Sequence, residues 1–182
     1  MRILKDHCIG LMIDLQERLM PHMHEQQMLL KNTEILIRGL QVLEVPVLIT
    51  EQYTKGLGST VEPLQQLFPS FQSIEKISFS CCDDDQFVSR LKTQAKKYII
   101  IAGIEAHVCV LQTTMDLIDR GFTPVVVEDC VSSRKVNDKQ VALARIEKSG
   151  GIITTYESIL FELTRFAGND TFKAISKLVK LQ

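Results

Sequence analysis

Three side chains supply a nucleophile, a base and a cation, each where an apolar run of the sequence ends. Asp14 closes the first run, Lys76 lies near the end of a weaker one, and Cys109 lies just after another, at the start of a helical pattern. A carboxylate can take the proton of a thiol, and a lysine can balance the charge. The set therefore suits catalysis by a cysteine nucleophile. Taken singly, each residue also fits a structural role: Cys109 as buried packing, Asp14 as a strand-end turn residue and Lys76 as a solvated surface lysine.

The position of Cys109 at a helix start bears on its acidity. The first turn of a helix has free N–H groups and the positive end of the dipole, and both lower the pKa of a thiol. We therefore predict that Cys109 is the most acidic of the five cysteines. With Asp14 nearby, two coupled resting states remain open: thiolate with protonated acid, or thiol with carboxylate.

Six apolar runs alternate with helical patterns along the chain. The runs are nearly continuous in Ile, Val and Leu, which is typical of strands buried on both faces of a parallel sheet. This alternation predicts a doubly wound α/β fold. If the strand order is 3-2-1-4-5-6, strands one and four flank the switch point, and Asp14 and Cys109 meet in the crevice. The expected strands are residues 8–14, 45–50, 73–77, 98–103, 123–128 and 151–155. The expected helices are residues 25–43, 83–96, 108–119, 137–148 and 169–181. Residues 55–60 are expected to form a mobile loop before a short helix.

Composition narrows the classes of function. The 182 residues suit one domain, residues 1–182. A net charge of −1 and scattered Lys and Arg do not favour a nucleic-acid partner. The apolar runs are far shorter than the ~20 residues that cross a bilayer, so no membrane association is expected. With no transit peptide visible and an odd number of cysteines, we expect a cytoplasmic protein, and a mitochondrial association is left open.

Neither a metal site nor a cofactor motif is visible in the sequence. The four histidines follow no metal-binding pattern, and neither a dinucleotide fingerprint nor a P-loop is present. The acidic run at residues 83–85 is read as a solvated helix start. His107 is at best a pocket-lining residue, and for Cys81 and Cys82 loop packing is favoured over a redox role. We therefore expect no cofactor and no metal.

Several segments resemble the isochorismatase-like hydrolase superfamily, also called the cysteine hydrolase family. They are LMIDLQERL, EKISFS, IAGIEAHVCVLQTTMDLIDRGF, VVVEDCVSSR and GIITTYESILFEL, and they cover most of residues 8–163. The TEQY and KGLG segments resemble a eukaryotic isochorismatase-domain subgroup. The resemblance implies a Rossmann-like three-layer α/β/α sandwich around a six-stranded parallel sheet, in agreement with the alternation of runs.

The resemblance also implies roles for residues of this sequence. Asp14, Lys76 and Cys109 match a catalytic triad. A cis peptide before Glu105 and an oxyanion hole from the backbone N–H groups of Glu105 and Cys109 are implied too. Nicotinamidases of this superfamily carry an Asp-x-His metal motif after the second strand, but here the segment TEQYTKGLGST has no histidine. Isochorismatases that cleave a vinyl ether lack the cysteine, so isochorismate itself is not the expected substrate.

The resulting prediction is a hydrolase of a small-molecule, amide-type C–N bond that forms a cysteine thioester. We expect Gln52, Tyr53 and Phe79 to line its pocket. One alternative is a non-catalytic or regulatory interaction protein on the same fold. Another is a nucleic-acid-processing protein, because some relatives carry a ribonuclease label. Relatives are commonly homo-oligomers, and the apolar stretch 172–181 is expected to pack on its own sheet or, less favoured, on a neighbour.

Overall fold

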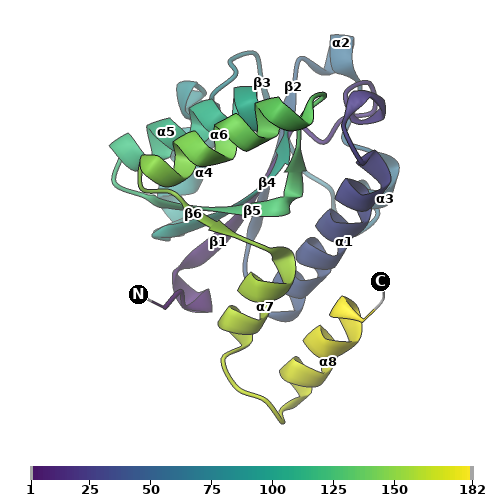
Figure 1. The fold of residues 1–182 in the computed structure, drawn as a ribbon, viewed down its shortest axis with the longest axis vertical. Helices are drawn as coiled ribbons and strands as arrows, with labels where there is room; N and C mark the ends of the chain where they lie inside the picture. Colours follow the sequence, from purple (N-terminus) through teal and green to yellow (C-terminus); the bar gives the residue numbers. More distant parts are fainter. Residues whose placement is uncertain (1, 181–182) are drawn as a thin grey trace.

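The computed structural model describes residues 2–180, whose centre is one sheet of six parallel strands (Figure 1). The strand order is β3-β2-β1-β4-β5-β6, which confirms the predicted order and fold class. Strands β1 and β4 are adjacent at the centre, and every residue of both is buried. The strands are β1 (Cys8–Ile13), β2 (Val47–Gln52), β3 (Ile74–Lys76), β4 (Tyr98–Ile104), β5 (Thr123–Ser132) and β6 (Ile152–Thr154).

Helices cover both faces of the sheet and make the three layers (Figure 1). One core joins alternate residues of the central strands to α1, α7 and α8, and a second core joins the other residues to α4, α5 and α6. This period of two explains the continuous apolar runs, because both faces of each central strand are covered. The helices are α1 (Gln26–Val42), α2 (Thr54–Leu57), α3 (Glu62–Gln65), α4 (Asp85–Gln94), α5 (Leu111–Asp119), α6 (Val136–Lys148), α7 (Tyr156–Thr164) and α8 (Asp170–Val179).

The C-terminal helix α8 packs within its own chain. It contacts α1 and α7 and buries Ile175 and Val179 in their shared core. The predicted stretch 172–181 therefore packs on two helices of its own chain, rather than directly on the sheet as we expected. Leu181, the last residue of that stretch, lies outside the described residues.

Several elements differ from the sequence-based prediction, which placed the second strand at residues 45–50 and the fifth at residues 123–128, whereas β2 ends at Gln52 and β5 at Ser132. Helix α7 was not predicted, although Thr155 caps it by accepting a hydrogen bond from the Ser158 N–H. Residues 54–57, expected to belong largely to a mobile loop, form the helical turn α2, and the expected short helix follows as α3. Within residues 2–180, no helix has the length and apolar character needed to cross a bilayer.

Candidate active site

The carboxyl end of β1 sets the position of Asp14. Its backbone N–H donates to the Thr50 carbonyl of β2 at 3.1 Å, and its φ of 53° turns the chain out of the strand. On the other side, Gly103 of β4 pairs with Ile13. A Cβ atom on Gly103 would lie 2.2 Å from the Ile13 carbonyl oxygen, so β4 approaches this closely only because that residue is glycine.

Lys76 and Asp14 form an ion pair with no exposed side-chain surface. Lys76 Nζ lies 2.6 Å from Asp14 Oδ2 and also donates to the carbonyls of Ser78 at 3.1 Å and Phe79 at 3.3 Å. These bonds use all three N–H donors of the ammonium group. Thr50 Oγ1 donates to the other carboxylate oxygen of Asp14 at 2.8 Å. Both groups of the pair are therefore held by several fixed partners.

The charge state of Lys76 follows from two opposing effects. Burial by itself lowers the pKa of this amine, because it disfavours the charged form. The charge and the hydrogen bond of the Asp14 carboxylate act in the other direction, and the net result is a raised pKa. The lysine is therefore charged at neutral pH.

Cys109 lies in a short π-helical turn, Ala106–Val110, that leads into α5. The peptide bond between Ile104 and Glu105, just before this turn, is cis, at the position that the resemblance implied. The Cys109 side chain is buried, and its thiol donates to Gln52 Oε1 at 3.2 Å. The side chains at the ends of β1, β2, β3 and β4 thus converge at one edge of the sheet.

The predicted acidity of Cys109 is wrong for this state of the protein. Burial raises the pKa of its thiol, the charge and hydrogen bond of Asp14 raise it further, and Lys76 offsets only part of this. The pKa of Cys82, by comparison, is raised only to about 11, mainly by burial. Of the two resting states left open by the sequence, the structure therefore favours thiol with carboxylate.

Two residues of this edge were not among the predicted site residues. Thr50 is the last residue of the second apolar run, and its hydroxyl binds Asp14. Cys81 lies fully buried beside it, with Sγ 3.8 Å from Thr50 Oγ1, and burial raises its pKa to about 12. The only sequence signal for Thr50 is that it is the polar residue at the end of the run VPVLIT, and its partner depends on how β1 and β2 pair.

Of the three expected pocket residues, the structure places the side chain of one, Gln52, against Cys109. Gln52 touches the Cys109 thiol, whereas the side chains of Tyr53 and Phe79 are 49% and 53% exposed. Those two residues contribute through the backbone, since the Tyr53 N–H donates to the Lys76 carbonyl at 3.0 Å and the Phe79 carbonyl accepts from Lys76. The carboxylate of Glu105 pairs with Arg134 at 3.0 Å.

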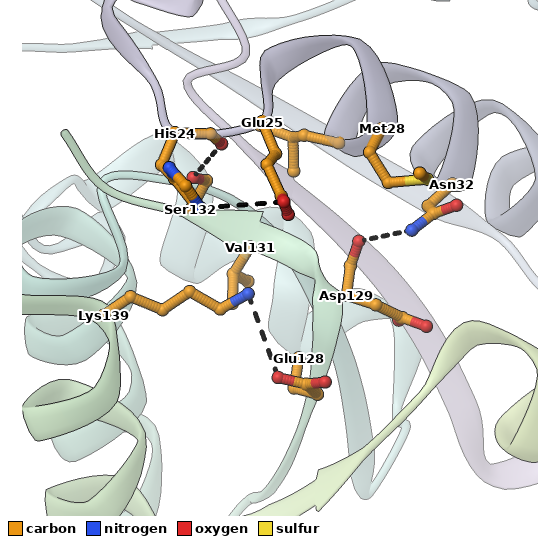
Figure 2. Close-up of a pocket in the computed structure, with 10 residues that line it drawn as sticks. His24, Glu25, Met28, Asn32, Glu128, Asp129, Val131, Ser132 and Lys139 are labelled. Carbon is orange, nitrogen blue, oxygen red and sulfur yellow. Dashed lines mark hydrogen bonds and ion pairs between the residues drawn. The ribbon is translucent and has the colours of Figure 1, made fainter. Parts of the chain in front are cut away.

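A separate polar cavity of about 140 Å³ lies between α1, the end of β5 and α6 (Figure 2). Several of its polar side chains are bound within the lining: Ser132 Oγ donates to the backbone carbonyl of His24 at 2.8 Å, and the Lys139 ammonium lies 3.8 Å from the Glu128 carboxylate. Its lining includes none of Asp14, Lys76 and Cys109. Over residues 2–180, no group of three or more His, Cys, Asp and Glu residues is arranged to hold a metal ion.

Comparison with known proteins identifies the family. The model of the isochorismatase domain matches residues 8–158, which include Asp14, Lys76 and Cys109. The chain belongs to the isochorismatase family. Family membership supports a hydrolase of the cysteine hydrolase type, and the sequence-based recognition of the superfamily is confirmed.

Relatives of the isochorismatase family match nearly the whole chain. Isochorismatase family protein 1B of Dictyostelium discoideum is 39% identical over 172 residues, which are 92% of this chain and 83% of the relative. The structure of a MAR1 ribonuclease from Caenorhabditis elegans is 36% identical, covers 100% of this chain and 94% of its own, and has a TM-score of 0.93. The YcaC gene product of Escherichia coli, described as an octameric hydrolase of unknown specificity, is 26% identical with a TM-score of 0.92, over 97% of this chain and 88% of its own.

Proposed function

We propose that the protein hydrolyses an amide-type C–N bond of a small molecule through a thioester on Cys109. The observation that carries this proposal is the buried ion pair of Lys76 and Asp14 next to a buried thiol. A carboxylate held in this way is a fixed acceptor for the thiol proton. Because Lys76 already makes three hydrogen bonds, its role is to orient Asp14 and balance its charge.

The first half of the reaction forms the thioester. Asp14 takes the proton of Cys109, and the sulfur attacks the carbonyl carbon of the substrate. The negative charge that develops on the carbonyl oxygen is stabilised by the backbone N–H groups of Glu105, which precedes the turn Ala106–Val110, and of Cys109 within that turn. Asp14 then gives the proton to the nitrogen as the C–N bond breaks, and the amine leaves.

The second half releases the acid. With the amine gone, Asp14 is again a carboxylate and takes a proton from a water molecule that attacks the thioester. The tetrahedral intermediate uses the same two backbone donors. When the C–S bond breaks, the proton on Asp14 returns to the sulfur, and the resting thiol is restored. Apart from the substrate and this water molecule, no co-reactant is needed to balance these steps.

Ribonuclease activity is the second candidate, because a relative that is 36% identical is described as a ribonuclease. The groups at the sheet edge favour the first candidate. Lys76 is committed to Asp14 and two carbonyls, and Arg134 is paired with Glu105, so these cations are already engaged. Binding of a polynucleotide at two salt concentrations tests this candidate, since contacts to phosphate must weaken as salt rises.

A screen of small amides, with release of ammonia or amine as the readout, tests the proposal. The variant Cys109→Ser should lose turnover of any amide that the wild-type protein hydrolyses. Cys82→Ser is a matched control, because Cys82 is also a buried cysteine but binds the Ser80 hydroxyl through its backbone and not Asp14. Turnover that survives in Cys109→Ser would refute the mechanism and favour a non-catalytic or differently catalysed role.

A further inference from the structure

The Gln52 side chain faces the thiol of Cys109 with a defined orientation. Its Nε2 donates to the Ile77 carbonyl at 3.3 Å, and a carbonyl can only accept, so the nitrogen must lie on that side. The oxygen Oε1 is therefore the atom 3.2 Å from Cys109 Sγ, and it accepts the thiol hydrogen. The orientation of the carboxamide thus follows from its two partners.

The backbone of Gln52 is held by a second glutamine. The fully buried Gln16 side chain accepts from the Gln52 N–H at 2.7 Å and donates to the Gln52 carbonyl at 2.9 Å. Its Nε2 also donates to the Gly58 carbonyl at 2.7 Å. Gln16 lies two residues after Asp14, so the same segment that carries the proposed base also fixes Gln52. The carboxamide tip of Gln52, in contrast, has only the long bond to Ile77 and the weak bond to the thiol.

The thiol has one hydrogen and two acceptors within its surroundings. Asp14 is close enough to raise the pKa of the Cys109 thiol, and Gln52 Oε1 accepts the hydrogen bond of the same thiol at 3.2 Å. A hydrogen directed at Gln52 is not directed at Asp14, and an acceptor that binds the neutral thiol disfavours the thiolate. Cys109 is 5% exposed while Gln52 is half-buried, so the carboxamide lies on the outer side of the sulfur.

We propose that Gln52 is a positioning residue that caps the nucleophile at rest: its carboxamide holds the thiol hydrogen away from Asp14 and covers the sulfur until a substrate carbonyl displaces it. This inference rests on the proposed function, because it needs Cys109 as the nucleophile and Asp14 as the base. The hydrogen bonds from Gln16 hold the backbone of Gln52 in place. The carboxamide itself makes only two weaker hydrogen bonds, so a substrate can displace it. The thiol is then free to turn its hydrogen toward Asp14.

The rate at which iodoacetamide alkylates Cys109, followed by mass spectrometry at pH 7.5 without substrate, tests this cap. Gln52→Met keeps the length of the side chain but removes the acceptor, so labelling should be about fivefold faster, as expected for the loss of one hydrogen bond. Gln52→Glu places a charged acceptor beside the thiol, so labelling should be at least about fivefold slower. Gln27→Met, at an exposed position of α1, is the matched control and should label like the wild-type protein.

Opposite effects of the two variants separate a cap from a merely structural residue. The buried Cys8 and Cys130 report unfolding in the same spectra, because they react only if a variant opens. If Cys109 is labelled selectively but Gln52→Met is no faster than wild type, or Gln52→Glu is no slower, the cap is refuted and the proposed function stands. If Cys109 stays unlabelled in every variant while other cysteines react, the nucleophile itself, and with it the proposed function, is refuted.

Discussion

Lys76 Nζ lies 2.6 Å from Asp14 Oδ2, and neither side chain has exposed surface. Removing one partner of such a pair leaves an uncompensated buried charge, which typically costs about 3–5 kcal/mol. We expect Lys76→Met to lower the free energy of unfolding by this amount. The double variant Asp14→Asn, Lys76→Met should recover part of it, because no lone charge remains. Urea unfolding at pH 7 measures both.

The exposed pair of Lys173 and Asp170 is the control for that experiment. Their side chains are 71% and 97% exposed, so Lys173→Met should leave the urea midpoint nearly unchanged. A midpoint for Lys76→Met equal to that of Lys173→Met would contradict the prediction that loss of Lys76 leaves an uncompensated buried charge on Asp14.

Buried thiols should make the protein lose stability at alkaline pH. Burial raises the pKa of Cys8 from 9.0 to about 12. A group whose pKa is raised by folding contributes its full stability below the unfolded value, and this contribution is lost as pH rises toward the folded value. We therefore expect the free energy of unfolding to fall from about pH 9 upward.

The slope of that decline can be assigned to single cysteines. Cys8→Ala should flatten it by up to about 1.4 kcal/mol per pH unit, the value for one proton. Urea unfolding between pH 7 and pH 10.5 gives the slopes. A wild-type stability that stays constant from pH 8.5 to pH 10.5 would contradict the raised pKa values.

The buried parallel strands were predictable from the apolar runs of the sequence, whereas the strand order entered the prediction as an assumption that the structure confirms. Strands β1 and β4 are apolar on both faces, and only a central parallel strand needs this pattern. Helix α7 was missed because it starts directly after the short strand β6, with Thr155 as the cap and no polar segment to separate the two. Such a short helix is stabilised mainly by the packing of its apolar residues against other elements, and a local sequence pattern does not show this packing.

The sequence predicted which residues lie at the candidate site, but it did not predict which hydrogen bonds they make. Asp14 and Lys76 end strands, and the sheet order brings those ends together. The contacts of Thr50 with Asp14 and of Gln16 with Gln52 depend on strand register, which no single run specifies. The acidity of Cys109 was misjudged for a different reason. The sequence shows that Cys109 lies at the start of a helix, but it does not show that the side chain is buried, and burial raises the pKa of the thiol.

Activity should survive removal of metal ions. The segment after β2 carries no histidine, where nicotinamidases of the superfamily carry an Asp-x-His motif. We expect that exhaustive treatment with EDTA leaves the turnover of an amide found in the screen within about twofold of the untreated enzyme, since Cys109 is the nucleophile and Asp14 the base in the proposed steps. A loss that zinc or manganese restores would require a metal-assisted mechanism instead.

The protein is expected to form a homo-oligomer. The E. coli YcaC relative is described as octameric, and this chain matches 88% of it. Light scattering at micromolar concentration should give a mass that is a multiple of 20.6 kDa. A mass of one chain across that concentration range would show that the fold is shared without the assembly.

Replacing Asp14 should separate the acidity of the thiol from turnover. The Asp14 charge is one of the causes that raise the pKa of Cys109, while Lys76 lowers it. In Asp14→Asn that charge is gone and Lys76 remains, so alkylation of Cys109 at pH 7.5 should be at least about tenfold faster, which corresponds to one pKa unit. Turnover should fall by about 10²–10⁴, because the group that transfers the proton is lost. Labelling of the buried Cys130 in the same sample shows whether the variant stays folded. A folded Asp14→Asn protein in which Cys109 reacts more slowly than in wild type would mean that Asp14 already activates the thiol at rest, and retained turnover would remove Asp14 from the mechanism.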